Sequence, residues 1–155
     1  MIRSSPAARH WLIAAVAAGL VSAVTLAAFA AFAEVRAGLP PSTTYTFLAS
    51  AVGGSALADG PAAVSIGVLV LLVGTILWGC GYVYAARKQS QLLSRPLLSG
   101  AGFGVIVWFI MQVVLVGAGH YSAPTIYTFD RDMVAFILFF GIPLAVTAAR
   151  LLRAK

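Results

Sequence analysis

The stretch RPLLSGAGFGVIVWFIMQ, Arg95 to Gln112, decides the fold class of this chain. An arginine and a proline are followed by three glycines at alternate positions, then by bulky apolar residues and one glutamine. A glycine-rich phosphate loop would lie between a strand and a helix in water, and no strand pattern precedes this stretch. We therefore interpret it as a membrane-spanning helix whose glycines form a packing surface.

The composition of the whole chain also indicates a membrane protein. Of its 155 residues, 61% are hydrophobic and only 9% are charged, whereas about 25% are charged in a typical soluble domain. Too few polar side chains are present to cover a surface in water, and a lipid-facing surface does not need them. The net charge of +6 does not indicate nucleic-acid binding, because the basic residues lie at the ends of apolar runs, as topology signals do.

Four apolar segments can cross a bilayer core about 30 Å thick, which takes roughly 20 helical residues. Barrel strands would be about 9–11 residues long and would alternate in polarity, so these longer uniform runs predict helices. The predicted fold is an all-α integral membrane protein, a bundle of four transmembrane helices in one domain over residues 1–155. The spans we predict cover residues 11–33, 62–86, 97–119 and 129–150. The apolar run of the fourth is shorter, residues 133–149, and the residues on either side of it can extend the helix.

A further short helix is predicted between the first two spans, over residues 42–53. Pro40 and Pro41 end any helix before them, and Ser42 can cap the helix that follows. We expect this helix to lie at the outer membrane interface or to form a shallow re-entrant turn.

Charged residues distinguish the two sides of the predicted bundle. Eight of the ten basic residues lie near the two termini or between the second and third spans. The four acidic residues all lie in the other two predicted loops: Glu34, Asp59, Asp130 and Asp132. The positive-inside rule therefore predicts that both termini are cytoplasmic. A cleaved signal peptide ending in AFA before Glu34 is the alternative for the first segment, although its 23 apolar residues exceed the usual 7–15 or so.

Small residues predict where helices approach closely, because helix association in lipid depends on backbone packing and interhelical hydrogen bonds. The first span repeats small residues every four positions, and the third has a GxxxG spacing. These predicted packing residues are Ala15, Gly19, Ala23 and Ala27, with Gly100 and Gly104. They join helices of one chain, or of several chains in a homo-oligomer or a larger membrane complex; both alternatives stay open.

Few groups within the predicted spans can carry chemistry. None of the apolar runs, the fourth of which covers residues 133–149, contains Asp, Glu, Lys, Arg or His, which argues against a proton-coupled carrier. Gln112 is the most polar side chain at mid-membrane depth, and we expect its amide to bond to a neighbouring helix rather than to a substrate. Pro143, close to Gly141, predicts a kink in the fourth span.

We expect no catalytic residues, no cofactor and no metal site. The two histidines, His10 and His120, lie at opposite membrane faces in the predicted topology, separated by about 30 Å of bilayer, so they cannot hold one metal or haem together. A nucleophile, a base and an orienting group cannot be brought together within the spans either.

From about Ala49 to Arg150 the chain resembles a family of small uncharacterised bacterial four-span integral membrane proteins, a domain of unknown function. The resemblance rests on RPLLSGAGFGVIVWFIMQVVL and FGIPLAVTAAR, with Gly100, Gly104 and Gln112 at pattern positions. Family members often carry a histidine in the second span and another in the fourth, where this chain has Leu72 and Phe136, so no histidine ligand is implied here. The resemblance implies a bacterial inner-membrane protein and no particular activity.

These observations predict a multi-pass membrane protein with a non-catalytic structural or accessory role, packing with itself or within a larger complex. Its expected surroundings are the lipid bilayer, and no nucleic-acid partner is expected. The alternative is a small oligomeric transporter or channel, with Gln112 and the kink at Pro143 near its path.

Overall fold

The computed structural model describes residues 6–57, 59–117 and 126–153, and within these every regular element is helical. The fourth span consists of three elements that follow one another without a break, over residues 126–135, 136–141 and 142–153. In chain order the elements are α1 (Pro6–Arg36), α2 (Thr43–Gly53), the 3₁₀ turn η1 (Gly54–Leu57), α3 (Gly60–Lys88), α4 (Gln91–Ser94), α5 (Pro96–Gly117), α6 (Ile126–Ala135), the π-helix η2 (Phe136–Gly141) and α7 (Ile142–Arg153).

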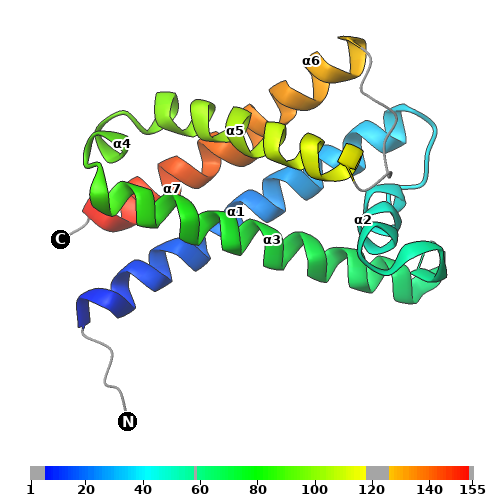
Figure 1. Ribbon diagram of the computed structural model, residues 1–155, viewed down its shortest axis with the longest axis horizontal. Helices are drawn as coiled ribbons and strands as arrows, with labels where there is room; N and C mark the ends of the chain where they lie inside the picture. Colours follow the sequence, from blue (N-terminus) through cyan, green and yellow to red (C-terminus); the bar gives the residue numbers. More distant parts are fainter. Residues whose placement is uncertain (1–5, 58, 118–125, 154–155) are drawn as a thin grey trace.

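Four helices are long and apolar enough to cross a membrane: Arg9–Arg36, Gly60–Lys88, Pro96–Gly117 and Arg131–Arg153. The predicted all-α fold with four spanning helices is therefore confirmed. Residues 118 and 119 of the predicted third span lie outside the described residues. Figure 1 shows the start of α1, the end of α7 and α4 at one end of the bundle, with α2 at the other. We call these the α4 end and the α2 end.

Helix α1 extends beyond the predicted end of the first span, and this changes the environment of Glu34. The helix continues to Arg36, because none of the residues from Glu34 to Arg36 breaks a helix, and Gly38, where φ is 73°, lies in the turn that follows. We expected Glu34 in a loop. It lies instead in the last turn of α1 and is only 8% exposed. The expectation that no acidic side chain lies within a spanning helix was wrong.

The small residues of α1 lie where this helix crosses α3. A Cβ atom added to Gly19 would lie 2.7 Å from the Cα atom of Ile76, and one added to Gly79 would lie 2.6 Å from the carbonyl oxygen of Ala15. Such distances leave no room for a side chain on either helix. The backbones of α1 and α3 therefore pack directly against each other at this crossing.

The glycines of α5 lie where this helix crosses η2. A Cβ atom on Gly100 would lie 2.6 Å from the carbonyl oxygen of Gly141, and one on Gly104 would lie 2.7 Å from that of Phe136. The predicted packing surface of the third span is thus occupied by the fourth span of the same chain.

Before Pro143, the fourth span widens into a π-helix. The N–H of Ile142 bonds to the carbonyl oxygen of Ile137, five residues back. Proline has no N–H to offer the carbonyl four residues before it, which is that of Phe139. That carbonyl instead accepts a hydrogen bond from Thr25 Oγ1 at 2.5 Å, and the Phe140 carbonyl accepts one from Ser22 Oγ at 3.1 Å. Two hydroxyls of α1 therefore supply the donors that this irregular segment needs in lipid.

Candidate functional site

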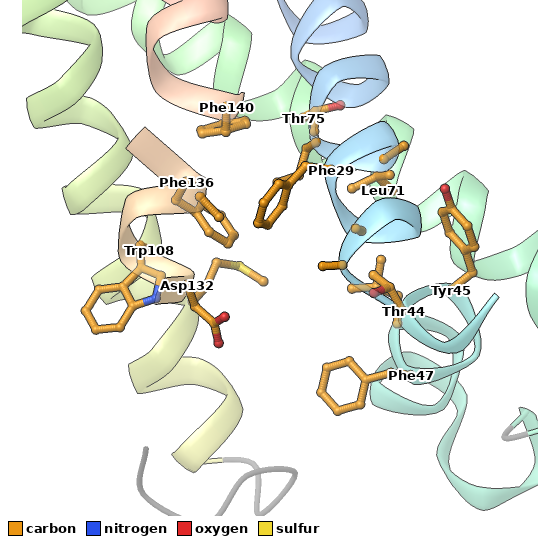
Figure 2. A pocket seen from close by; sticks show the side chains of 18 of the residues that line it. Phe29, Thr44, Tyr45, Phe47, Leu71, Thr75, Trp108, Asp132, Phe136 and Phe140 are labelled. Atoms are coloured by element: carbon orange, nitrogen blue, oxygen red, sulfur yellow. The ribbon is translucent and has the colours of Figure 1, made fainter. Parts of the chain in front are cut away.

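A cavity of about 420 Å³ lies inside the α2 end of the bundle. Its walls come from the second half of α1, from α2, from the middle of α3, from the second half of α5, and from α6 with η2. Figure 2 shows Trp108, Phe136 and Asp132 on one side and Thr44 and Tyr45 on the other. The cavity is therefore bounded by α1, α2, α3, α5, α6 and η2, and part of it is open to the outside.

Most of the cavity wall is apolar and much of it is aromatic. Figure 2 shows Phe47 projecting from α2 into the space between the two sides, and Thr75 and Phe140 at the inner end. The aromatic lining residues are Phe29, Tyr45, Phe47, Trp78, Trp108, Phe136 and Phe140. Ligand pockets typically combine such apolar walls with a few polar groups.

Glu34 provides the one buried carboxylate described in the cavity wall. Its Oε1 atom accepts hydrogen bonds from the backbone N–H and the hydroxyl of Thr44, both at 2.5 Å. Its Oε2 atom is buried and has no hydrogen-bond partner among the described residues. The carboxylate is thus fixed through one oxygen, while the other lacks a donor.

Helix α2 is capped by Glu34 and not by the residue we predicted. Ser42 occupies the N-cap position, but its side chain makes no capping hydrogen bond. The N–H of Thr44, in the first turn of α2, is satisfied by the Glu34 carboxylate instead. The predicted N-cap position of Ser42 is confirmed, but its capping hydrogen bond is not formed. Glu34, ten positions before Thr44 and brought back by the turn at Pro40 and Pro41, reaches the donor instead.

The position of α2 depends on close contact with α3. A Cβ atom on Gly67 would overlap the carbonyl group of Tyr45, so only glycine lets α2 approach this closely. Ala49 of α2 and Ala63 of α3 are also completely buried. The predicted interfacial helix therefore packs against a spanning helix and forms one wall of the cavity.

Two more polar groups line the cavity. The Oε1 atom of Gln112 is buried and has no hydrogen-bond partner among the described residues, although we expected this amide to bond to a neighbouring helix. Asp132 accepts a hydrogen bond from Arg131 at 3.1 Å, in an ion pair whose arginine side chain is 67% exposed. Gln112 and Glu34 thus each keep one buried acceptor atom without a donor among the described residues, covered by the residues of the cavity wall.

The structure also shows where the other residues discussed in the sequence analysis lie. Ala15 and Ala23 are buried in the core, and Ala27 lines the cavity. Pro143 follows η2, just beyond the residues that line the cavity. The side chain of His10 bonds to the carbonyl oxygen of Leu151 at 3.0 Å, and His120 lies outside the described residues.

Most cavity residues were not predicted, and Glu34, Thr44 and Phe47 are among them. Glu34 had one visible signal, as the first acidic residue after a long apolar run without a helix breaker. Its partner Thr44 had none, because the contact depends on how α2 folds back. Within the described ranges, no three His, Cys, Asp or Glu side chains lie close enough to hold a metal ion together.

Comparisons of this chain with known protein families, with curated proteins and with solved structures find no match. The resemblance to a bacterial four-span family therefore stays a prediction.

Proposed function

We propose that this chain is a non-catalytic multi-pass membrane protein that binds a small, largely apolar molecule in the cavity at the α2 end and takes part in its transport. The cavity itself carries this proposal. Its volume, about 420 Å³, lies within the range of small-molecule pockets, about 300–1,000 Å³. Its aromatic walls suit an apolar body, and its few polar atoms can orient one end of a ligand.

The contacts of the glycines favour a transport role over the structural or accessory role that the sequence suggested first. Gly100 and Gly104 pack against η2 of the same chain, so this surface is not free to receive a helix of a partner. Gln112, which we associated with a transport path, lines the cavity. The binding site that we propose lies within a single chain and not between subunits of an oligomeric pore.

The resemblance to a bacterial four-span family suggests a bacterial inner membrane, and the charge distribution supports an orientation with both termini in the cytoplasm. Arg87, Lys88 and Arg95 flank α4, and Arg150 and Arg153 end α7, all at the α4 end. By the positive-inside rule this end faces the cytoplasm. The cavity, at the α2 end, then faces the outer side of the membrane.

Tryptophan fluorescence can test ligand binding in this cavity. Trp78 and Trp108 line it, and Trp11→Phe removes the third tryptophan of the chain, which lies toward the α4 end. In this background, reconstituted into phosphatidylcholine nanodiscs, we expect 2-(4-bromophenyl)ethanol to quench fluorescence in a saturable way. Bromine quenches indole on contact, so saturation reports occupancy and not simple partition into lipid.

Two glycines of α3 offer a matched pair of variants. A Cβ atom on either Gly74 or Gly81 meets no other atom within 4 Å, but only Gly74 lines the cavity. We expect Gly74→Leu to fill the cavity and abolish saturable quenching. Gly81→Leu, about two turns further along α3, should leave it unchanged. Two results would count against the proposed function: quenching that rises linearly with probe concentration in the Trp11→Phe protein, or equal quenching in Gly74→Leu and Gly81→Leu.

A further inference from the structure

We propose that Glu34 binds the ammonium group of the ligand, so that the cavity selects a primary or secondary amine on an apolar or aromatic body. This inference rests on the proposed function and specifies the chemistry of the ligand. It follows from the unpaired oxygen of a buried carboxylate, from the lack of a neighbouring cation, and from the aromatic walls.

The buried carboxylate needs a positive partner that the described chain does not supply. Buried charges in proteins are normally paired, because an isolated ionised group in apolar surroundings is very unfavourable. Arg131 also lines the cavity, but its side chain is largely exposed and pairs with Asp132, and Arg36, two residues after Glu34, is exposed. A cationic ligand in the cavity would complete the pair.

Capping of α2 accounts for only one of the two carboxylate oxygens of Glu34. A helix cap needs one acceptor oxygen, and the Oε1 atom meets that need through Thr44. A neutral acceptor such as asparagine or serine satisfies a helix N-terminus equally well. The Oε2 atom, buried and without a donor among the described residues, is an added cost that capping does not require. An N–H group of a ligand would remove that cost.

The aromatic lining suits the same class of ligand. Phe47 and Trp108 face the cavity from opposite sides (Figure 2), and aromatic faces attract cations as well as apolar groups. Because the Oε2 atom is buried, binding of the ligand requires that the side chains covering this atom move aside. An amine with at least one N–H fits this arrangement, since it combines positive charge with a hydrogen-bond donor.

Such an ammonium group could come from a free amine or from the ethanolamine headgroup of a phospholipid. Both sources carry the same N–H donors on an apolar body. Choline headgroups carry no N–H, so phosphatidylcholine nanodiscs provide a membrane without this donor.

The experiment compares 2-(4-bromophenyl)ethylamine with its neutral analogue 2-(4-bromophenyl)ethanol, using quenching of Trp78 and Trp108 in the Trp11→Phe background. We expect the amine to reach half-saturation at a concentration at least about tenfold lower, as a hydrogen bond to a charged group can provide. Glu34→Gln removes the charge and keeps an amide oxygen for Thr44. It should bring the amine to the level of the alcohol and leave the alcohol unchanged.

The outcomes separate this inference from the proposed function. If amine and alcohol bind equally well to the protein with Glu34 intact, the cavity binds ligands but the selectivity for amines is wrong. If neither probe saturates, the proposed function fails. If Glu34→Gln weakens both probes equally, Glu34 acts only through the fold and the inference is overturned.

A second titration, with phosphatidylethanolamine in the nanodiscs, distinguishes a lipid headgroup from a free amine as the source of the ammonium group. Part of the phosphatidylcholine is replaced by phosphatidylethanolamine, and the titration with the bromo-amine is repeated. Competition that disappears in Glu34→Gln supports the lipid headgroup as the occupant. An unchanged titration supports a free amine.

Discussion

Ser22 and Thr25 show how single hydroxyls make an irregular helix possible in lipid. Pro143 leaves the Phe139 carbonyl without a donor four residues on, and both this carbonyl and that of Phe140 accept hydrogen bonds from hydroxyls of α1. Ser22 is completely buried, so water cannot replace its bond. These contacts join the first and fourth spans next to the cavity.

We expect Ser22→Ala to destabilise the folded protein by about 0.5–2 kcal/mol, the range measured for interhelical hydrogen bonds in membranes. The substitution removes the donor and leaves the Phe140 carbonyl buried. Ser65→Ala is the matched control, because Ser65 is exposed and bonds only to the carbonyl of Pro61 in its own helix. Unfolding of both variants in mixed micelles, followed by circular dichroism, measures the difference. Equal stability of the two would contradict the importance assigned to Ser22.

At the scale of single residues, the sequence predicted the distortion at Pro143 but not the hydrogen-bond partners that compensate for it or that bury Glu34. Pro143 predicted a distortion of the fourth span because proline lacks an N–H. Its compensation by Thr25, more than a hundred residues earlier, depends on how two helices cross and has no local signal. Glu34 was assigned to a loop because a charge after an apolar run usually marks the end of a span. Its burial results from Thr44, which supplies the donors.

At the level of helices, the glycines of α5 determine how closely it approaches the fourth span. We expect Gly100→Ala to destabilise the protein by about 1–3 kcal/mol, as overpacking of a core does, because its Cβ atom would lie 2.6 Å from the carbonyl oxygen of Gly141. Gly102→Ala, on the same helix with nothing within 4 Å, should be neutral or stabilising by up to about 1 kcal/mol. Thermal unfolding in detergent measures both. A destabilised Gly102→Ala beside an unchanged Gly100→Ala would contradict this packing.

The helices themselves were predictable because the length and uniformity of an apolar run reflect the bilayer directly. All four spans therefore have counterparts in the structure, and the short helix after Pro41 became α2. The packing position of α2 could not be predicted from the sequence. Its contact with Gly67 and its part in the cavity wall depend on tertiary packing, and an isolated apolar stretch of that length fits an interfacial helix equally well.

The two ends of the molecule differ in both charge and shape. Basic residues gather at the α4 end, near Arg87, Lys88 and Arg153, while Glu34 and Asp132 lie at the α2 end beside the cavity. Orientation in the membrane follows mainly from the basic residues. The side from which a ligand enters the cavity therefore depends on charges at the far end of the bundle.

Cysteine labelling tests this orientation. Cys80 is the only cysteine in the chain, so Cys80→Ala provides a background without thiols. Ala37 follows α1 at the α2 end and Gln89 follows α3 at the α4 end, and both are exposed. In intact spheroplasts we expect a membrane-impermeant maleimide to label Ala37→Cys but not Gln89→Cys, and to label both after the membrane is opened. The reverse pattern would place the cavity on the cytoplasmic side, and the ligand would then be drawn from inside the cell.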